Sequence, residues 1–208
     1  MRIIKITLFC IALLTLNNCA SGYKTIAPKT INYVSATEKD SIKLEYKYDV
    51  LYKRYEKKEV KKGVKVVAVK ITNNSKKDIK FGKDAVLIYE NGSTVMVMDN
   101  DKVFSTIKQN PAIYLLYLLL TPINLYTTDT NSNGLQEETS SFPIGLILGP
   151  GIAGGNMIAA STANKKFKTE LEEYKIHGQI IKQGETKYGL IGIKSDTFEA
   201  LNLATRSN

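Results

Sequence analysis

The feature that most constrains this chain is a run of 22 uncharged residues, 142–163, in a sequence otherwise rich in lysine. The run contains five glycines and two prolines. A helix of this length rises about 33 Å, whereas the hydrocarbon core of a bilayer is about 30 Å thick. Because proline and glycine disfavour a helix interior, we expect a broken apolar arm up to Gly149 and a helix that starts at Gly151.

A second apolar segment precedes this run. It contains NPAIYLLYLLLTPINLY, and the polar sequence DTNSNGLQEE separates the two apolar segments. The order apolar, polar, apolar predicts an inserted helical hairpin over residues 104–175. Long apolar arms are rarely left in water, because exposed apolar patches mark interaction sites. Three placements stay open: in a membrane, against another subunit or partner, or in the core of the chain itself.

Small residues recur every four positions in the second arm, at Gly151, Gly155, Ala159 and Ala163. On a helix they share one face, which lets another helix approach closely. The row resembles the glycine-zipper segments of some outer-membrane lipoproteins, although small residues also fill contacts between soluble helices. We expect the helix to continue through NKKFKTELEEYKI and to pack its apolar face on the rest of the protein.

The N-terminus is typical of an export signal. Arg2 and Lys5 precede an apolar run of 11 residues, 6–16, which is too short to span a bilayer. The sequence thus predicts a signal peptide over residues 1–18. Cys10 and Cys19 are the two cysteines of the chain, so its body offers neither an internal disulfide nor a thiolate metal site.

The apolar run ends in Leu16-Asn17-Asn18-Cys19, which resembles the lipobox of bacterial lipoproteins. The resemblance implies cleavage before Cys19 and lipidation of its thiol. It also implies a location in the cell envelope, at the outer membrane of a Gram-negative bacterium, with residues 19–40 as a lipidated tether. The alternative is an ordinary secretory signal in which the cysteine is incidental.

Two regions, 41–103 and 176–208, have the pattern of β-strands. Apolar and polar residues alternate from Ile42 to Lys53, VKVVAVKIT is apolar enough for a central strand, and one more strand or strand pair surrounds Gly184. Asn91-Gly92 lies between two apolar runs and predicts a type I′ hairpin turn. The fold class is therefore mainly β with inserted α (α+β), with five to seven antiparallel strands.

Two segments, VVAVKITNNSKKDIKFGKDAVLIYENG and IIKQGETKYGLIGI, resemble the immunoglobulin-like domains of exported bacterial lipoproteins. The resemblance covers about 80 residues. It implies an antiparallel β-sandwich and a role in interaction, and it brings no catalytic residues with it.

Positive charge is concentrated between residues 43 and 80, which hold 13 Lys/Arg and five Asp/Glu in a chain of net charge +9. One interpretation is a basic sheet face that binds anionic lipid head groups or glycans through Lys57, Lys58, Lys61 and Lys62. The other is a solvated face whose lysines keep edge strands from pairing with other chains. We do not expect nucleic acid as a partner, because export separates the chain from it.

Candidate catalytic and metal-binding residues are few. His177 is the single histidine, and Glu170, Glu172 and Glu173 are expected to form solvated ion pairs with neighbouring lysines. The tip sequence approaches a calcium loop, but Ser140 stands where the bidentate glutamate belongs. We therefore expect no enzyme activity, no metal and no cofactor.

These observations favour a membrane-anchored envelope lipoprotein that acts as a non-catalytic structural or interaction subunit. Its expected partners are the membrane, through Cys19 and the apolar hairpin, and either further copies of itself or an envelope complex.

Overall fold

A computed structural model describes residues 19–130 and 132–206, with the side chains of 136–139 left out. The predicted signal peptide, including Cys10, lies outside the described residues. The chain divides into two compact units, of which one contains Asn110–Thr162 and the residues up to Gly22, and the other contains Tyr23–Gln109 and Ala163–Asn208. We call them the apolar unit and the sheet unit. Helices and antiparallel sheets both occur, so the α+β class is confirmed.

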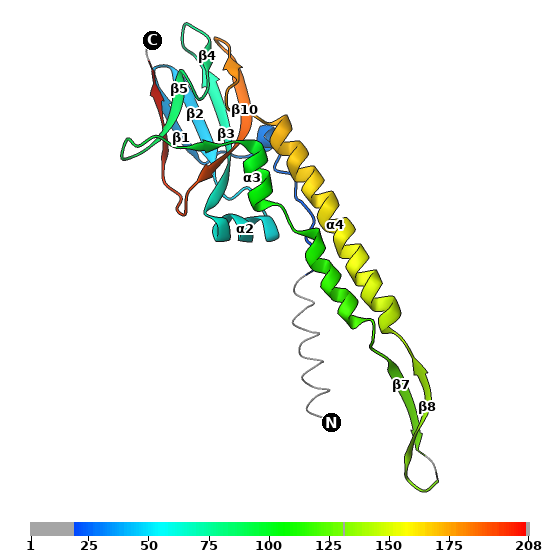
Figure 1. The fold of residues 1–208 in the computed structure, drawn as a ribbon. Coiled ribbons are helices and arrows are strands. Elements are labelled where there is room, and N and C mark those ends of the chain that lie inside the picture. Colours follow the sequence, from blue (N-terminus) through cyan, green and yellow to red (C-terminus); the bar gives the residue numbers. More distant parts are fainter. Residues whose placement is uncertain (1–18, 131, 207–208) are drawn as a thin grey trace. The chain divides into compact units, whose positions relative to one another are not determined.

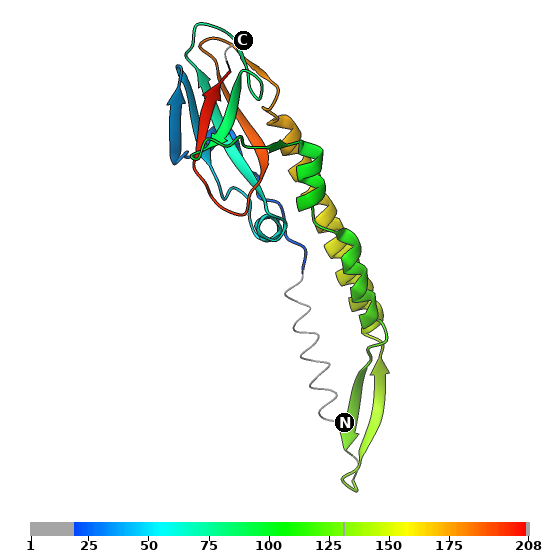
Figure 2. The same ribbon diagram turned by 60° about the vertical axis from the view of Figure 1, so that its left-hand side comes forward.

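The sheet unit is built on a five-stranded antiparallel sheet with strand order β1-β2-β3-β10-β6 (Figures 1 and 2). Two further strand pairs, β5 with β11 and β4 with β9, lie outside this sheet. The strands are β1 (Ser35–Lys39), β2 (Ile42–Lys47), β3 (Val64–Asn73), β4 (Ile79–Lys80), β5 (Ala85–Tyr89), β6 (Val97–Met98), β9 (Ile180–Ile181), β10 (Thr186–Lys194) and β11 (Leu201–Thr205).

Strand β3 is the middle strand, as its composition predicts, and both of its faces are buried. Val67, Val69 and Ile71 point into a core that also contains β5, β11 and the β4/β9 pair. Val66 and Ala68 point the other way, into a core formed with helices. Alternate residues of a strand face opposite sides, so this one strand supplies both cores.

Helices cover the second face of the sheet. They are α2 (Arg54–Lys62), α3 (Asn100–Ile107) and the part of α4 (Gly145–Glu173) from Ala163 onwards. Asn164 fixes this layer, because its side chain bonds both the N–H and the C=O of Gln109 and accepts from the Tyr55 hydroxyl. A buried amide with three partners holds three segments in one register.

Two local predictions for the strands are wrong. The alternation that starts at Ile42 continues as a strand only to Lys47, and the polar residues beyond it form α2. The type I′ turn lies at Asp40-Ser41, where both φ angles are positive (50° and 60°). At Asn91-Gly92 only Gly92 has a positive φ, and Tyr89 N–H donates to Ser93 C=O. That geometry is typical of a type I turn followed by a bulge.

The apolar unit is not the purely helical hairpin that the sequence suggested. Its first arm is a 3₁₀ helix, η2 (Pro111–Leu120), and its tip is a β-hairpin of β7 (Leu125–Thr130) and β8 (Gln136–Phe142). The predicted break at Gly149-Pro150-Gly151 is wrong, since α4 runs unbroken from Gly145 to Glu173. Pro150 is only the sixth residue of α4, where its missing N–H costs a single helical hydrogen bond.

Candidate functional site

The two arms of the apolar unit pack along one narrow seam. Tyr114 and Tyr117 of η2 are buried, with stacked rings 6.4 Å apart, and they contact Ala153 and Ala160 of α4. Gly149 lies on the same α4 face, where a Cβ would sit 2.9 Å from the Thr121 methyl and 3.2 Å from the Tyr117 carbonyl oxygen. Small residues on α4 therefore let η2 approach closely.

This seam is not the predicted row of small residues. Gly151, Gly155 and Ala159 are exposed, and a Cβ at either glycine would meet nothing within 4 Å. Ala163 is buried, but in the sheet unit. The row that packs against the first arm is Gly145, Gly149 and Ala153. The predicted row begins two positions further along the helix from Gly149. Use of the exposed row by another helix stays a prediction.

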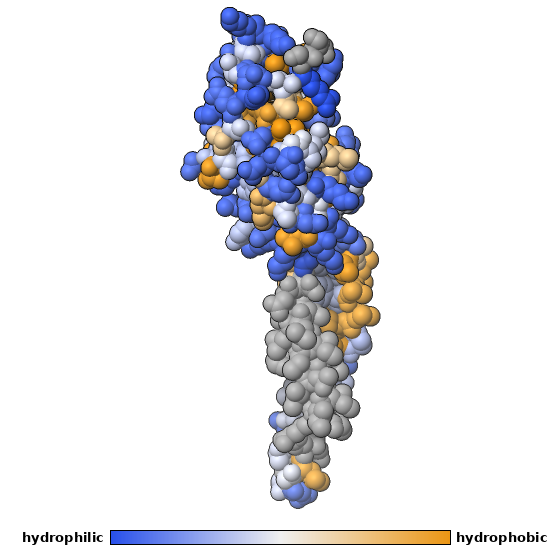
Figure 3. Space-filling view, turned by 90° about the vertical axis from the view of Figure 1, so that its left-hand side faces the viewer, coloured by the Kyte–Doolittle hydropathy of each residue, from blue (hydrophilic) through white to orange (hydrophobic). Residues whose placement is uncertain are grey.

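Most of the remaining apolar side chains of this unit are exposed. Leu119 is 75% exposed and Ile147 is 63% exposed. In Figure 3 hydrophobic colour lies at the edge of the apolar unit that is visible beside the grey residues, whereas the sheet unit is mostly hydrophilic. Exposed large side chains of this unit are Ile113, Leu115, Leu116, Leu118, Leu119, Ile123, Leu125, Tyr126, Leu135, Phe142, Leu146, Ile147, Leu148 and Ile158.

Charge is nearly absent from the same stretch of sequence. Residues 110–164 contain no lysine or arginine, and their three acids, Asp129, Glu137 and Glu138, belong to the β-hairpin. Both helical arms are apolar on all sides, a pattern that is found in buried or membrane-embedded helices. Among the described helices, α4 alone is long and apolar enough to cross a membrane by length and composition.

Cys19 lies at the apolar unit. It is exposed, and the next residue, Ala20, donates its N–H to the Asn156 side chain at 2.5 Å and packs beside the Tyr114/Tyr117 seam. The residue predicted to carry the lipid is therefore held next to the exposed apolar surface of this unit.

The segment after Cys19 is packed, not a free tether. In the sheet unit, Glu170 accepts the backbone N–H groups of Ile26 and Ala27 at 2.8–3.1 Å and the Tyr23 hydroxyl at 2.5 Å. Burial and this carboxylate raise the pKa of Tyr23 far above its usual value. The expected solvated ion pair at Glu170 is therefore wrong, since its side chain is 5% exposed.

Sequence spacing could have located this buried glutamate. Glu170 follows Phe167 by three positions and precedes Tyr174 by four, so it lies on the apolar face of its helix. Glu172 points away from that face and pairs with Lys168 at 3.6 Å, as the sequence predicted.

The four candidate lysines, Lys57, Lys58, Lys61 and Lys62, lie on α2 and not on a sheet face. The Lys58 ammonium donates to the Lys108 carbonyl. Burial lowers the pKa of Lys58, and the cations of Lys62, Arg54, Lys108 and Lys61 lower it further. The helix thus brings these four positive charges closer together along the chain axis than an extended strand would.

Glu59 is a second buried carboxyl that the sequence did not reveal. It projects from the opposite side of α2 and accepts the Val66 N–H at 2.5 Å, with 1% of the residue exposed. Burial raises its pKa to about 7, an effect that the Val66 hydrogen bond and Lys65 oppose. In the described part of the chain, strand β2 pairs with residues 68–73 of β3 and leaves the start of β3 without a strand partner on that side. Glu59 accepts the backbone N–H of Val66 in this unpaired part.

No group of three or more His, Cys, Asp or Glu side chains in the described residues could hold a metal ion. His177 lies beside the Phe81 ring, and its pKa is lowered by burial and by Lys175. Comparison with protein-family models, curated proteins and solved structures finds no match for this chain. Its function must therefore be inferred from its own geometry.

Proposed function

We propose that the protein is a lipid-anchored, non-catalytic component of a bacterial envelope whose apolar unit enters the bilayer beside an acylated Cys19. The observation that carries this proposal is the exposed apolar surface of residues 110–162, which contains no basic side chain and adjoins Cys19. Such a surface is too large to be left in water.

The dimensions of α4 support insertion. From Gly145 to Thr162, the last residue of α4 in the apolar unit, the helix would rise about 27 Å, which is close to the thickness of the hydrocarbon core. Lys165 and Lys166 follow three and four residues later in the sequence, and the exposed Tyr126 and Phe142 precede the helix across the hairpin. Basic and aromatic residues at the ends of an apolar segment are typical of membrane interfaces.

The β-hairpin sets a limit on how the unit can insert. Its strands pair only with each other among the described residues, so their outer backbone groups need water or another partner. We therefore place β7 and β8 outside the hydrocarbon core, with their acidic residues in water.

The sheet unit is the proposed platform on the aqueous side, with the immunoglobulin-like sandwich as its finer fold. The support for this is the core between the five-stranded sheet and the β5/β11 and β4/β9 pairs, in which apolar residues from both layers meet. Antiparallel layers with such a shared core are the basis of β-sandwiches.

The proposal can be tested by membrane fractionation of four proteins. The unaltered protein should need detergent for extraction, and Cys19→Ala should remain partly membrane-bound through the apolar unit. Adding Leu119→Arg and Ile147→Arg to Cys19→Ala should release it, because an arginine inside the bilayer costs about 3 kcal/mol.

The matched control is Thr169→Arg with Cys19→Ala, a change at an exposed position of the same helix outside the apolar unit. It should leave membrane retention unchanged. Recovery of Cys19→Ala entirely as a soluble monomer would refute insertion. Recovery as a soluble oligomer that Leu119→Arg dissociates would assign the surface to contacts between copies instead.

A further inference from the structure

The exposed side of α2 is a strongly basic surface of the sheet unit. Lys57, Lys58, Lys61 and Lys62 fall within six consecutive positions of one nine-residue helix. Among the described residues, no carboxylate lies within 4.0 Å of any of these four ammonium groups, whereas lysines 43, 70, 168 and 187 each have such a partner. We call these four lysines the α2 lysines.

The acids of α2 compensate little of this charge. Glu59 is buried on the opposite side, and its raised pKa leaves it partly protonated at neutral pH. Glu56 is exposed in the first turn, so a single outward-facing acid accompanies the α2 lysines.

Such crowding works against the helix itself. Two pairs of like charges lie four residues apart on this helix: Lys57 with Lys61, and Lys58 with Lys62. Pairs of this kind destabilise helices. An arrangement that lowers helix stability and has no carboxylate partner among the described residues favours an external anion as its counterpart.

Apolar and aromatic side chains are exposed beside these lysines. Val60, between Lys58 and Lys61, is 69% exposed, and Tyr52, just before the helix, is 52% exposed. The Tyr52 ring lies under two ammonium groups, with Lys24 Nζ at 5.7 Å and Lys53 Nζ at 5.5 Å from its centroid. Lysines combined with tyrosine and an aliphatic residue suit the polar boundary of a bilayer.

Chain connectivity limits the distance between Lys24 and the proposed lipid anchor. Lys24 is five residues after Cys19, so the two can be at most about 18 Å apart. A bilayer that held an acylated Cys19 would therefore lie within reach of Lys24 and of the Tyr52 ring beneath it.

We propose that the α2 lysines, with Lys24 and Tyr52, bind the phosphate groups of anionic lipids in the membrane to which Cys19 is anchored. This inference rests on the proposed membrane anchoring and adds a preference for lipid head group. A single acyl chain binds a membrane only weakly, and a basic surface provides a further, charge-dependent contribution to membrane binding.

The test is vesicle binding by full-length Cys19→Ala protein, which removes the acyl chains. We expect tighter binding to vesicles of phosphatidylglycerol and phosphatidylcholine than to phosphatidylcholine alone, and the difference should shrink as salt rises. Changing all four α2 lysines to Gln should weaken binding to the anionic vesicles at least about 100-fold, because each lysine near the surface contributes about fivefold.

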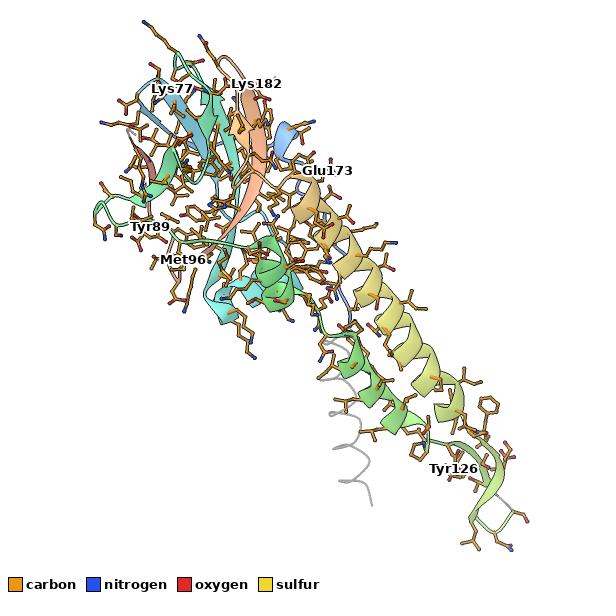
Figure 4. The ribbon with its side chains drawn as sticks, turned by 45° about the horizontal axis from the view of Figure 1, so that its top comes forward. Lys77, Tyr89, Met96, Tyr126, Glu173 and Lys182 are labelled. Atoms are coloured by element: carbon orange, nitrogen blue, oxygen red, sulfur yellow. The ribbon has the colours of Figure 1, made fainter. Side chains whose placement is uncertain are left out.

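A matched control has four lysines changed to Gln at the far end of the strands. Lys76, Lys77, Lys80 and Lys182 are exposed, and Figure 4 shows Lys77 and Lys182 at the loops beyond β3 and β9. Strand β3, of ten residues and about 33 Å in length, separates α2 from the loop that holds Lys77. This control should bind anionic vesicles like the Cys19→Ala protein.

The outcomes separate the two proposals. Equal binding to anionic and neutral vesicles, or equal loss in both quadruple variants, would overturn the role of the α2 lysines while leaving insertion intact. Absence of binding to neutral vesicles would count against insertion alone. Binding to soluble heparin or DNA that is as tight as binding to anionic vesicles would overturn the lipid assignment.

Discussion

Two buried carboxyl groups, Glu59 and Glu170, accept backbone N–H groups of segments that no strand or helix partner covers. Glu59 bonds Val66 at the edge of β3, and Glu170 bonds the chain at Ile26 and Ala27. Leaving such N–H groups buried without an acceptor would cost about 1–3 kcal/mol each. Both glutamates therefore have a structural role that their charge alone would not suggest.

Glu59 should make stability depend on pH. Its pKa is about 7 in the folded protein and about 4.5 when exposed, so the folded state binds more protons between these values. Its contribution to the free energy of unfolding is complete below pH 4.5 and is lost as pH rises to 7, by on the order of 3 kcal/mol. Above pH 7 its contribution is constant.

The measurement is urea unfolding of the unaltered protein and of Glu59→Gln from pH 4.5 to 8. Gln retains an oxygen that can accept from Val66 but cannot ionise. The difference in unfolding free energy between the two proteins should therefore shift in favour of Glu59→Gln as pH rises. Taking this difference cancels His177, whose lowered pKa has the opposite effect. A difference independent of pH would contradict the assignment.

At the scale of elements, α4 is one helix with two kinds of neighbour. Its first part contacts η2 through small residues, and its last part packs Phe167 and Leu171 on the sheet. The close approach to η2 depends on Gly145 and Gly149. A Cβ at Gly145 would collide with the backbone, at 2.6 Å from the Thr121 carbonyl oxygen and 2.8 Å from the Ile123 nitrogen.

Alanine at these glycines should open the seam between α4 and η2. Gly145→Ala and Gly149→Ala should each destabilise it by about 1–3 kcal/mol. A Cβ at Gly145 meets backbone atoms, which cannot move aside, and a Cβ at Gly149 meets the Thr121 methyl and the Tyr117 carbonyl oxygen. Chymotrypsin cleavage within residues 110–162 should become about 5- to 150-fold faster, since cleavage follows local opening.

The matched controls are Gly151→Ala and Gly155→Ala on the same helix. Both sites are open, and alanine favours helix by about 1 kcal/mol over glycine, so cleavage should slow or stay unchanged. Faster cleavage in these controls than in Gly145→Ala would place the seam on the predicted row after all.

At the scale of the whole molecule, the two units differ in charge and in core. The sheet unit holds all 27 Lys/Arg that follow residue 22, while 110–162 holds none. Among the described residues, the buried cluster of the apolar unit contains four residues, compared with 17 and 12 in the two clusters of the sheet unit. A core of four side chains provides little protection against local unfolding in water.

Hydrogen exchange should therefore report the two units separately. In buffer, amides of η2 and of α4 up to Thr162 should exchange much faster than those of β3 and β10. Adding vesicles to the Cys19→Ala protein should slow exchange in 110–162 by at least about tenfold and leave β3 unchanged. Slow exchange in both units without vesicles would show that the apolar unit is stable in water.

Much of the architecture follows from local sequence pattern. Three local patterns each indicated the correct type of element. They are the alternation in Ile42–Lys47 and the apolar residues on both faces of β3, which indicated strands, and the uncharged length of 142–163, which indicated a helix. Local pattern suffices here because the periods of strands and helices depend on neighbouring residues alone. The separation of apolar residues from lysines along the chain likewise indicates an apolar insertion, although the predicted bounds, 104–175, are wider than the unit itself, 110–162.

Tertiary structure decided what local pattern could not. Contacts between segments distant in sequence decided three features: the row of α4 that faces η2, the glutamates that are buried and the strands that pair. Examples of such contacts are the hydrogen bonds of Glu170 with Ile26 and of Asn164 with Gln109. Gly145 and Gly151 have the same local chemistry, yet only the first meets another backbone. Contact between distant residues is set by the packing of the whole chain, because each buried group must find its partner there.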